Sequence, residues 1–268
     1  MIALITPTGA RADQIKLCAR WMKNQSYDGE VLWVIVDDAV PKTTDFITAD
    51  FRENWKIAKV YPSPAWSFGQ NTQARNIRDG INYILSNYRI VGWNGHPANI
   101  EAIFIIEDDD YYSPLYLQVM MAHFDNYTAI GERDTIYYNV TTRSYMVNNN
   151  RQHVSLFQLA IKPKVLNLFM QCLNHKFIDY NFFNHMKAQG YWQRNEILIF
   201  RDIDLGIGIK GMPGRGGIGA GHKMSNRANK DTALKYLYSK IGDDAKQYER
   251  YYRFGDKPRN SLFVKRGV

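Results

Sequence analysis

Two apolar runs in the first half of the chain end directly in acidic residues, and this pattern limits the possible folds more than any other feature. Residues 31–36 precede Asp37 and Asp38, and residues 103–106 precede Glu107, Asp108, Asp109 and Asp110. Short apolar runs that end in polar clusters are typical of strands buried on both faces of a parallel sheet. The acids then lie at the carboxyl ends of the strands, the edge at which open α/β sheets bind ligands.

The surrounding segments alternate between strand and helix patterns. Strands are expected at residues 2–5 and within 54–64, and amphipathic helices at 13–23, 70–88 and 116–124. Beyond residue 134 we expect antiparallel strand material, two helices (one of them at 179–189), a strand region within 196–209 and a helical tail from 229 to 252. The order predicts an α/β fold: a mostly parallel sheet flanked by helices, a smaller antiparallel portion and a helical C-terminal extension.

Composition places the chain among globular proteins, with 45% hydrophobic and 22% charged residues. The sequence has neither an apolar run of the roughly 18 residues that a membrane span needs nor a secretion signal, so we expect no membrane span and a cytoplasmic location. Cys18 and Cys172 have no neighbouring ligand pattern and predict neither a disulfide framework nor a zinc site.

Positive charge is concentrated in the last quarter of the chain. Residues 201–268 hold 15 of the 34 Lys and Arg and 7 of the 26 Asp and Glu, which leaves 19 of each in residues 1–200. The excess predicts an anionic partner for this region, either the phosphates of a small ligand or a polyanion such as nucleic acid.

The acidic run at 107–110 calls for a cationic partner, because four carboxylates this close repel one another. Hard divalent ions such as Mg²⁺ or Mn²⁺ prefer carboxylate oxygens and are often shared with substrate phosphates. The first hypothesis is therefore a metal–phosphate site. The alternative is a solvated acidic loop that caps the helix beginning near Ser113 and Pro114.

In their order along the chain, the motifs resemble those of the GT-A glycosyltransferases, in particular family 2, which uses nucleotide-sugar donors. LITPTGAR resembles the family's opening strand and Pro-Thr turn, VIVDDAV its nucleoside-binding strand and QARNIRDGI its Ala-Arg-Asn-x-Gly helix. IEDDDYYSP resembles the strand with the Asp-x-Asp metal motif, and IDYNFFNHMKAQGY the helix start that carries the general base. The resemblance covers about residues 1–200.

The resemblance implies a metal-dependent enzyme that transfers a sugar from a nucleotide-sugar, with UDP as the expected nucleotide and Mn²⁺ or Mg²⁺ as the expected metal. It implies donor contacts from Thr6, Pro7, Thr8, Arg11, Asp37, Asp38, Arg75 and Glu107, a metal bound by Asp108, Asp109 and Asp110, and Asp179 as the base of an inverting reaction. It also implies a GT-A catalytic domain at 1–225, divided into a donor half (1–133) and an acceptor half (134–225), followed by the extension at 226–268.

Two residues depart from the family pattern. Glu107 stands where the first Asp of the metal motif is usual, which leaves open whether Asp108 and Asp110 or Glu107 and Asp109 hold the ion. Ile178 replaces the Glu that usually precedes the base.

Four of these residues also have purely structural interpretations. Asp37 and Asp38 are also common in turns, and Arg75 could form an ordinary surface ion pair. Asp179 could cap the helix that follows it.

The glycine-rich segment 206–223 fits neither a dinucleotide fingerprint nor a P-loop, because Pro213 interrupts the first pattern and His222 takes the lysine position of the second. A third interpretation is a lid in which Arg215 and Lys223 close over the donor diphosphate and His222 joins the metal ligands. A loop histidine without such a role is the alternative.

The tail mixes tyrosines with basic residues, a combination that binds phosphates and unstacked bases but also occurs in helices that pack on a domain. For most of these tyrosines we expect packing on the domain, while the localised positive charge favours a nucleic-acid acceptor. The favoured acceptor is a hydroxymethylated pyrimidine in DNA, of the type that phage enzymes modify in the host cytoplasm. The alternatives are a glycan or protein acceptor, or a non-catalytic module that binds nucleotide or nucleic acid.

Overall fold

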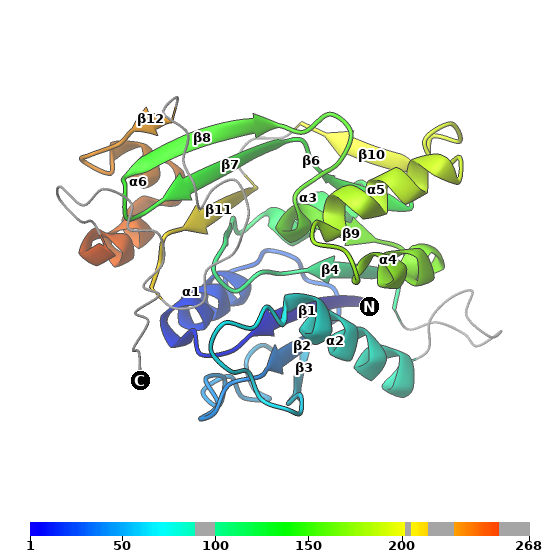
Figure 1. Ribbon diagram of the computed structural model, residues 1–268, viewed down its shortest axis with the longest axis horizontal. Helices are drawn as coiled ribbons and strands as arrows, with labels where there is room; N and C mark the ends of the chain where they lie inside the picture. The colour runs from blue at the N-terminus through cyan, green and yellow to red at the C-terminus, as the bar shows by residue number, and fades with distance from the viewer. Residues whose placement is uncertain (89–99, 202–204, 214–227, 252–268) are drawn as a thin grey trace, which may run out of the picture.

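The computed structural model describes residues 1–88, 100–201, 205–213 and 228–251, and all structural statements below concern these ranges (Figure 1). The predicted donor and metal residues Arg215, His222 and Lys223 lie outside the described residues, as does the end of the basic tail.

A seven-stranded sheet forms the centre of the molecule. Its order is β10-β6-β9-β4-β1-β2-β3. Among the described strands of this sheet, β9 alone runs antiparallel to its neighbours. The strands are β1 (Ile2–Thr8), β2 (Val31–Asp37), β3 (Trp55–Val60), β4 (Ala102–Ile105), β6 (Ala129–Glu132), β9 (Leu159–Ile161) and β10 (Ile197–Phe200).

Helices cover both faces of this sheet because its inner strands are apolar on both faces. The side chains of Ile2 and Leu4 pack with α1 (Ala12–Lys23) and α3 (Tyr116–Ala122). Ala3 and Ile5 pack on the other face, with α2 (Gln73–Asn87), α4 (Leu166–Cys172) and α5 (Ile178–Ala188). Figure 1 shows the sheet between these two helix layers.

A second, mostly antiparallel sheet has the order β12-β8-β7-β11-β5. Its strands are β5 (Tyr111–Tyr112), β7 (Asp134–Asn139), β8 (Ser144–Asn149), β11 (Gly206–Lys210) and β12 (Asn229–Lys230). A third core cluster joins this sheet to Trp21 of α1 and to the last described residues, where α6 (Lys235–Ile241) runs into a 3-10 helix (Gly242–Tyr251). Two further 3-10 turns are η1 (Leu156–Gln158) and η2 (Pro163–Val165).

The predicted fold class is confirmed, with a mostly parallel sheet, an antiparallel portion and helices at 235–251. The helical tail expected from residue 229 instead begins with the short strand β12. The domain boundaries stay predictions. Residues 134–225 contribute β9 and β10 to the central sheet, and residues 226–268 contribute β12 to the second one. None of the helices in the described ranges has the length and apolar character needed to cross a bilayer.

Strand register brings the predicted site residues to one edge of the central sheet. Thr8 at the end of β1 pairs with Asp37 at the end of β2, and Ile5 pairs with Ile105 just before the acidic run. Gly80 lets α2 approach this edge closely, because a Cβ at that position would lie 2.7 Å from the Ile5 side chain. The first turn of α2 therefore lies beside the strand ends.

Candidate functional site

The carboxylates of residues 107–110 meet two basic side chains from other parts of the fold. Arg11, which precedes α1, places Nη1 3.0 Å from Asp108 and Nη2 against Asp109. Lys210, the last residue of β11, places Nζ 2.7 Å from Asp110, 3.9 Å from Glu107 and 4.0 Å from Asp109. The cluster thus holds four acids and two bases.

Neutral donors from neighbouring strands and helices fix individual carboxylates. The Thr8 hydroxyl donates to Asp108 at 2.6 Å, and the Ile209 amide donates to Asp110 at 3.0 Å. The Gln73 amide, at the start of α2, donates to Glu107 at 2.6 Å. Hydrogen bonds of this kind orient the carboxylates toward a common space, which a solvated loop would not do.

Burial dominates the electrostatics of the acids. It raises the pKa of Asp108 to about 6 and also raises the pKa values of Glu107 and Asp110, although Arg11 and Lys210 oppose the shift. Burial alone would lower the pKa of Lys210, but the carboxylates of Asp109, Asp110 and Glu107 outweigh it and raise that pKa. Both basic groups therefore stay charged.

The donor set fits a hard divalent ion. Glu107, Asp109 and Asp110 each offer an oxygen, and the three atoms lie within 4.8 Å of one another. Asp110 Oδ2 is buried and has no hydrogen-bond partner among the described residues. When ionised, four acids and two bases leave two negative charges, which one divalent cation would balance.

The two acids at the end of β2 have different surroundings. Asp37 accepts hydrogen bonds from the backbone amides of Ala39 and Thr43 and from the Thr44 hydroxyl, and so it holds the loop that follows the strand. Asp38 instead faces α2 and is fully buried.

Asp38 accepts hydrogen bonds from three side chains at the start of α2. Arg75 Nη2 and Asn76 Nδ2 each lie 2.9 Å from Asp38 Oδ2, and the Thr72 hydroxyl donates to the same oxygen. Arg75 also donates to the Pro64 carbonyl at 2.8 Å. Arg75 thus forms an ion pair with a wholly buried carboxylate, so this pair is not an ordinary surface ion pair.

The opening turn contributes structure as well as site residues. Thr6 accepts a hydrogen bond from the Trp33 indole at 2.8 Å, and both Thr6 and Pro7 are buried. Thr8 is the residue of this turn that contacts the acidic cluster.

Asp179 lies in the first turn of α5 and is half-buried. Burial raises its pKa, and backbone amides together with the nearby His153 partly offset the rise. Its carboxylate accepts a hydrogen bond from the Tyr180 amide at 2.9 Å. A group in these surroundings can act as a base and also stabilise the start of the helix.

The segment 153–158 connects Asp179 to the acidic cluster. The Leu156 backbone and the charge of His153 both lower the pKa of Asp179. Phe157, which follows Leu156, places its ring centre 5.9 Å from Lys210 Nζ. One short segment therefore contacts both the predicted base and the lysine of the acidic cluster.

Comparison with known proteins identifies the architecture. No protein-family model matches the chain, and no curated protein sequence does. Among solved structures, S. aureus TarS 1-349 in complex with UDP superposes with a TM-score of 0.50 and 16% identity, over 78% of this chain and 60% of that one. The chain has a GT-A fold. The same fragment in complex with UDP-GlcNAc gives a TM-score of 0.48 and 15% identity, over 80% of this chain and 59% of that one.

At these identities the likeness concerns the fold, and the chain spans about 60% of the TarS fragment. Within the GT-A fold of this chain, the predicted residues Thr8, Arg11 and 107–110 come together in one cluster. Asp38 and Arg75 form a second group beside it, and Asp179 lies next to the Leu156 backbone of η1.

Lys210, a cationic partner of the acids at 107–110, was not identified from the sequence. It ends the apolar run GIGIK, which is the same signal that identified the acids at the ends of β2 and β4. Gln73, Thr72 and Asn76 were also missed, because a polar residue in a helix gives no sign of which strand end it faces.

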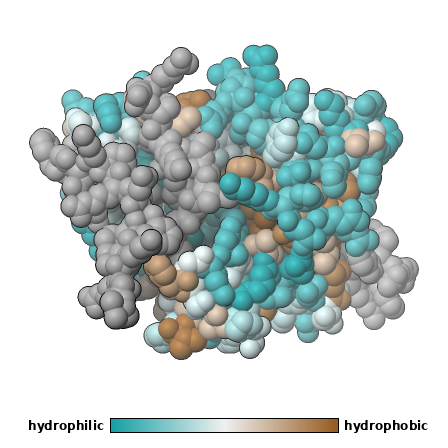
Figure 2. Space-filling model, in the orientation of Figure 1, coloured by the Kyte–Doolittle hydropathy of each residue, from teal (hydrophilic) through white to brown (hydrophobic). Residues whose placement is uncertain are grey.

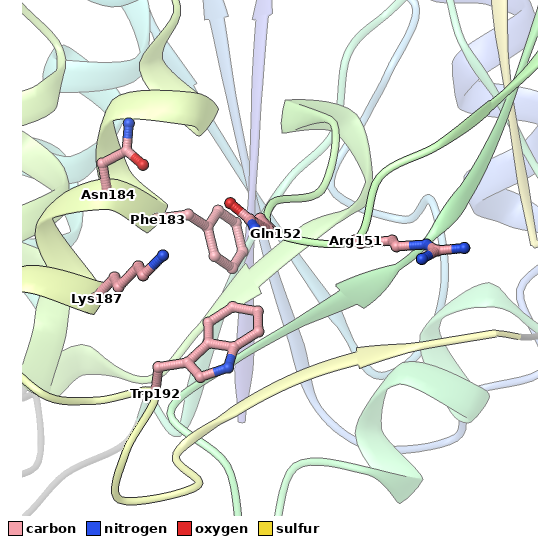
Figure 3. Close-up of a pocket in the computed structure, with 6 residues that line it drawn as sticks. All are labelled: Arg151, Gln152, Phe183, Asn184, Lys187 and Trp192. Carbon is pink, nitrogen blue, oxygen red and sulfur yellow. The ribbon is translucent and has the colours of Figure 1, made fainter.

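A hollow of about 210 Å³ opens along α5 (Figure 3). It is lined by Arg151, Gln152, Phe183, Asn184, Lys187 and Trp192. In Figure 3 the Lys187 and Gln152 side chains lie on either side of the Phe183 ring above Trp192, while the Arg151 guanidinium points away from the others. Figure 2 shows the molecule in the orientation of Figure 1. The described part of this face is mostly hydrophilic, with hydrophobic residues in small separate groups.

Proposed function

We propose that this chain is a glycosyltransferase that uses a UDP-sugar and a divalent metal ion. The observation that carries the proposal is the convergence of Glu107, Asp109 and Asp110 at the carboxyl edge of the parallel sheet, with Asp110 Oδ2 buried and unpaired among the described residues. The GT-A fold shared with UDP-bound TarS supports it. A metal ion bound there would neutralise negative charge that develops on the leaving diphosphate.

The donor is assigned to the space beside Asp38, Thr8 and Arg11. Asp38 is held by Arg75 and Asn76 at the end of β2, where a carboxylate can accept hydrogen bonds from a ribose or a base. Arg11 contacts Asp108 and Asp109 and supplies a permanent positive charge at the proposed donor site. Arg75 supports the site by fixing Asp38, rather than by reaching the diphosphate.

Asp179 is proposed as the general base of an inverting transfer. A base must be ionised near the operating pH and able to accept the proton of an acceptor hydroxyl. The raised pKa of Asp179, caused by burial, strengthens its carboxylate as a proton acceptor. The contact of Asp179 with the segment that carries Phe157, a neighbour of Lys210, supports this role.

The acceptor is proposed to be polyanionic, with a hydroxymethylated pyrimidine in DNA as the favoured case. Lys187 is eight residues after Asp179 on α5, about 12 Å along the helix axis. Its carbonyl accepts a hydrogen bond from the Gly190 amide, and its ammonium has no hydrogen-bond or ion-pair partner among the described residues. Trp192 beside it is 39% exposed. A cation beside an exposed indole suits a phosphate next to a ring that can stack.

Residues 201–268 hold the excess of basic residues and could extend such a binding surface. Part of the tail is structural, however. Tyr248 is fully buried, and Tyr236 stacks on Tyr145 with ring centres 3.5 Å apart.

A transfer assay tests the function directly. The protein is incubated with Mn²⁺ and a panel of UDP-sugars, and UDP release is measured alone, with hydroxymethylated DNA, with unmodified DNA and with free glycans. Release that requires hydroxymethylated DNA supports the whole proposal. Release with glycans alone would leave the glycosyltransferase standing and exclude the DNA acceptor, and no release under any condition would contradict the enzyme.

A further inference from the structure

Lys210 carries its side chain into the same three carboxylates that form the candidate metal site. Its ammonium lies 2.7 Å from Asp110 and within 4.0 Å of both Glu107 and Asp109. The side chain is buried, with 6% of the residue exposed. The oxygens available to a metal ion are therefore already near a positive charge.

The fold holds Lys210 in this position. Its backbone is paired in β11 with Asn139 of β7, and its carbonyl accepts a hydrogen bond from the Val140 amide at 2.8 Å. The rings of Tyr137 and Phe157 flank the ammonium, each with its centre 5.9 Å from Nζ. Ring faces at this distance attract a cation, so the ammonium is stabilised from two directions besides the carboxylates.

We propose that Lys210 is an internal cation that competes with the divalent metal ion for Glu107, Asp109 and Asp110, and thereby sets the metal affinity of the site. The physical reason is that a metal ion that binds these oxygens comes close to the ammonium, and the like charges repel in a buried, weakly screened environment. Asp110 must also be shared between the two cations or released by one of them.

This proposal rests on the metal site of the proposed function, but it makes a separate claim. A strictly structural lysine would tie β11 to the acidic run and leave metal affinity unchanged when replaced. A competing lysine weakens metal binding, so its removal must strengthen it.

The test is titration of Mn²⁺ into the full chain, without nucleotide, at about pH 8, where ordinary carboxyl groups are ionised. Free Mn²⁺ is followed by electron paramagnetic resonance. We expect Lys210→Met to bind Mn²⁺ about tenfold or more tightly than wild type, because it removes a nearby charge. Lys210→Arg retains the charge and should stay within about threefold of wild type by the same reasoning.

Lys162→Met is the matched control. Lys162 follows Ile161, which pairs with Ile103 at the amino end of β4, so it lies at the opposite edge of the sheet from the acidic run. Its removal should leave Mn²⁺ affinity unchanged. Unchanged or weaker binding in Lys210→Met, or no Mn²⁺ binding to any variant, would overturn the proposal.

Two further measurements keep the test decisive. Lys210→Gln retains a hydrogen-bond donor for Asp110 and replaces the Met variant if that variant fails to fold. In the wild type, the Lys210 Nζ resonance should shift on saturation with Mg²⁺, and an unmoved resonance with Mg²⁺ bound would also overturn the proposal. Tighter Mn²⁺ binding without any UDP binding would support the competition and contradict the donor assignment instead.

Discussion

Asp38 and Arg75 form an ion pair between the end of β2 and the first turn of α2, with 2.9 Å between Oδ2 and Nη2 and no exposed surface on Asp38. The pair joins two segments that are far apart in the sequence. It also fixes the carboxylate that we assign to the nucleoside. Loss of the arginine would leave a buried charge that Thr72 and Asn76 compensate only in part.

We therefore expect Arg75→Ala to lower the free energy of unfolding by about 2 kcal/mol, because breaking a buried pair leaves an uncompensated charge. Arg78→Ala on the same helix removes an exposed hydrogen bond to Asn174 and should change stability by less than about 1 kcal/mol. Urea unfolding of both variants checks this, and equal effects would show that the Asp38 pair has no special weight.

Asp109→Asn should abolish the metal dependence of UDP binding. The change removes one of the three candidate ligands and one of the contacts of Arg11 while keeping the shape of the side chain. We expect the UDP affinity measured with Mn²⁺ to fall about tenfold or more and to match that measured with chelator. Asp125→Asn, at an exposed site, is the control and should bind UDP as the wild type does.

Asp179→Asn should lower kcat by about 100-fold or more and leave UDP affinity unchanged, since a general base contributes about that much. Asparagine retains an oxygen that can accept the Tyr180 hydrogen bond, so the helix start is preserved and only the basic group is lost. A kcat close to that of wild type would assign Asp179 a purely structural role.

The pH profile gives a second readout for the same carboxylate. Because burial raises the pKa of Asp179 above its ordinary value of 3.8, wild-type kcat/KM should fall on acidification at a pH above that value. The residual kcat/KM of Asp179→Asn should not fall on acidification in this way. If the same fall remained in the variant, it would be due to the titration of another group.

Stability in chelator should depend on pH through Asp108. Its folded-state pKa of about 6 lies above its ordinary value of 3.8, so the stabilising contribution is full below 3.8 and is lost as the pH rises through 6. The free energy of unfolding of the wild type should therefore fall by about 3 kcal/mol relative to Asp108→Asn between about pH 4 and 7. A pH-independent difference would contradict the buried environment of this carboxyl.

Lys187→Glu should weaken binding of an anionic acceptor about tenfold and leave UDP binding intact, because it reverses the charge beside Trp192 in the hollow. Lys56→Glu, on the edge strand β3, is the control and should bind both ligands as the wild type does. If Lys187→Glu and wild type bound DNA with equal affinity, the hollow along α5 would not be part of the acceptor site.

The sequence predicted the fold because its strands and helices differ in period and length. The apolar runs before Asp37 and Glu107 could be read as buried strands, and their parallel pairing with β1 brings both acidic ends to one edge of the sheet. The antiparallel insertion of β9 between β4 and β6 could not be predicted, since a three-residue strand has no recognisable period.

Within the candidate site, the sequence identified the acids together with Thr8 and Arg11, but not their partner Lys210. The run at 107–110 predicted a cation, and the fold supplies two of its own, Arg11 and Lys210, before any metal ion binds. Lys210 is 100 residues from Asp110 in the chain, and only the pairing of β11 with β5 and β7 brings the two together. Contacts of this kind depend on tertiary structure.

The central claim is that the carboxyl edge of this sheet binds a nucleotide through a divalent ion. Calorimetric titration of UDP into the purified wild-type protein, first with Mn²⁺ and then with excess chelator, tests it most directly. We expect saturable UDP binding with Mn²⁺ that weakens about tenfold or more in chelator. Absence of UDP binding in both conditions would contradict the claim.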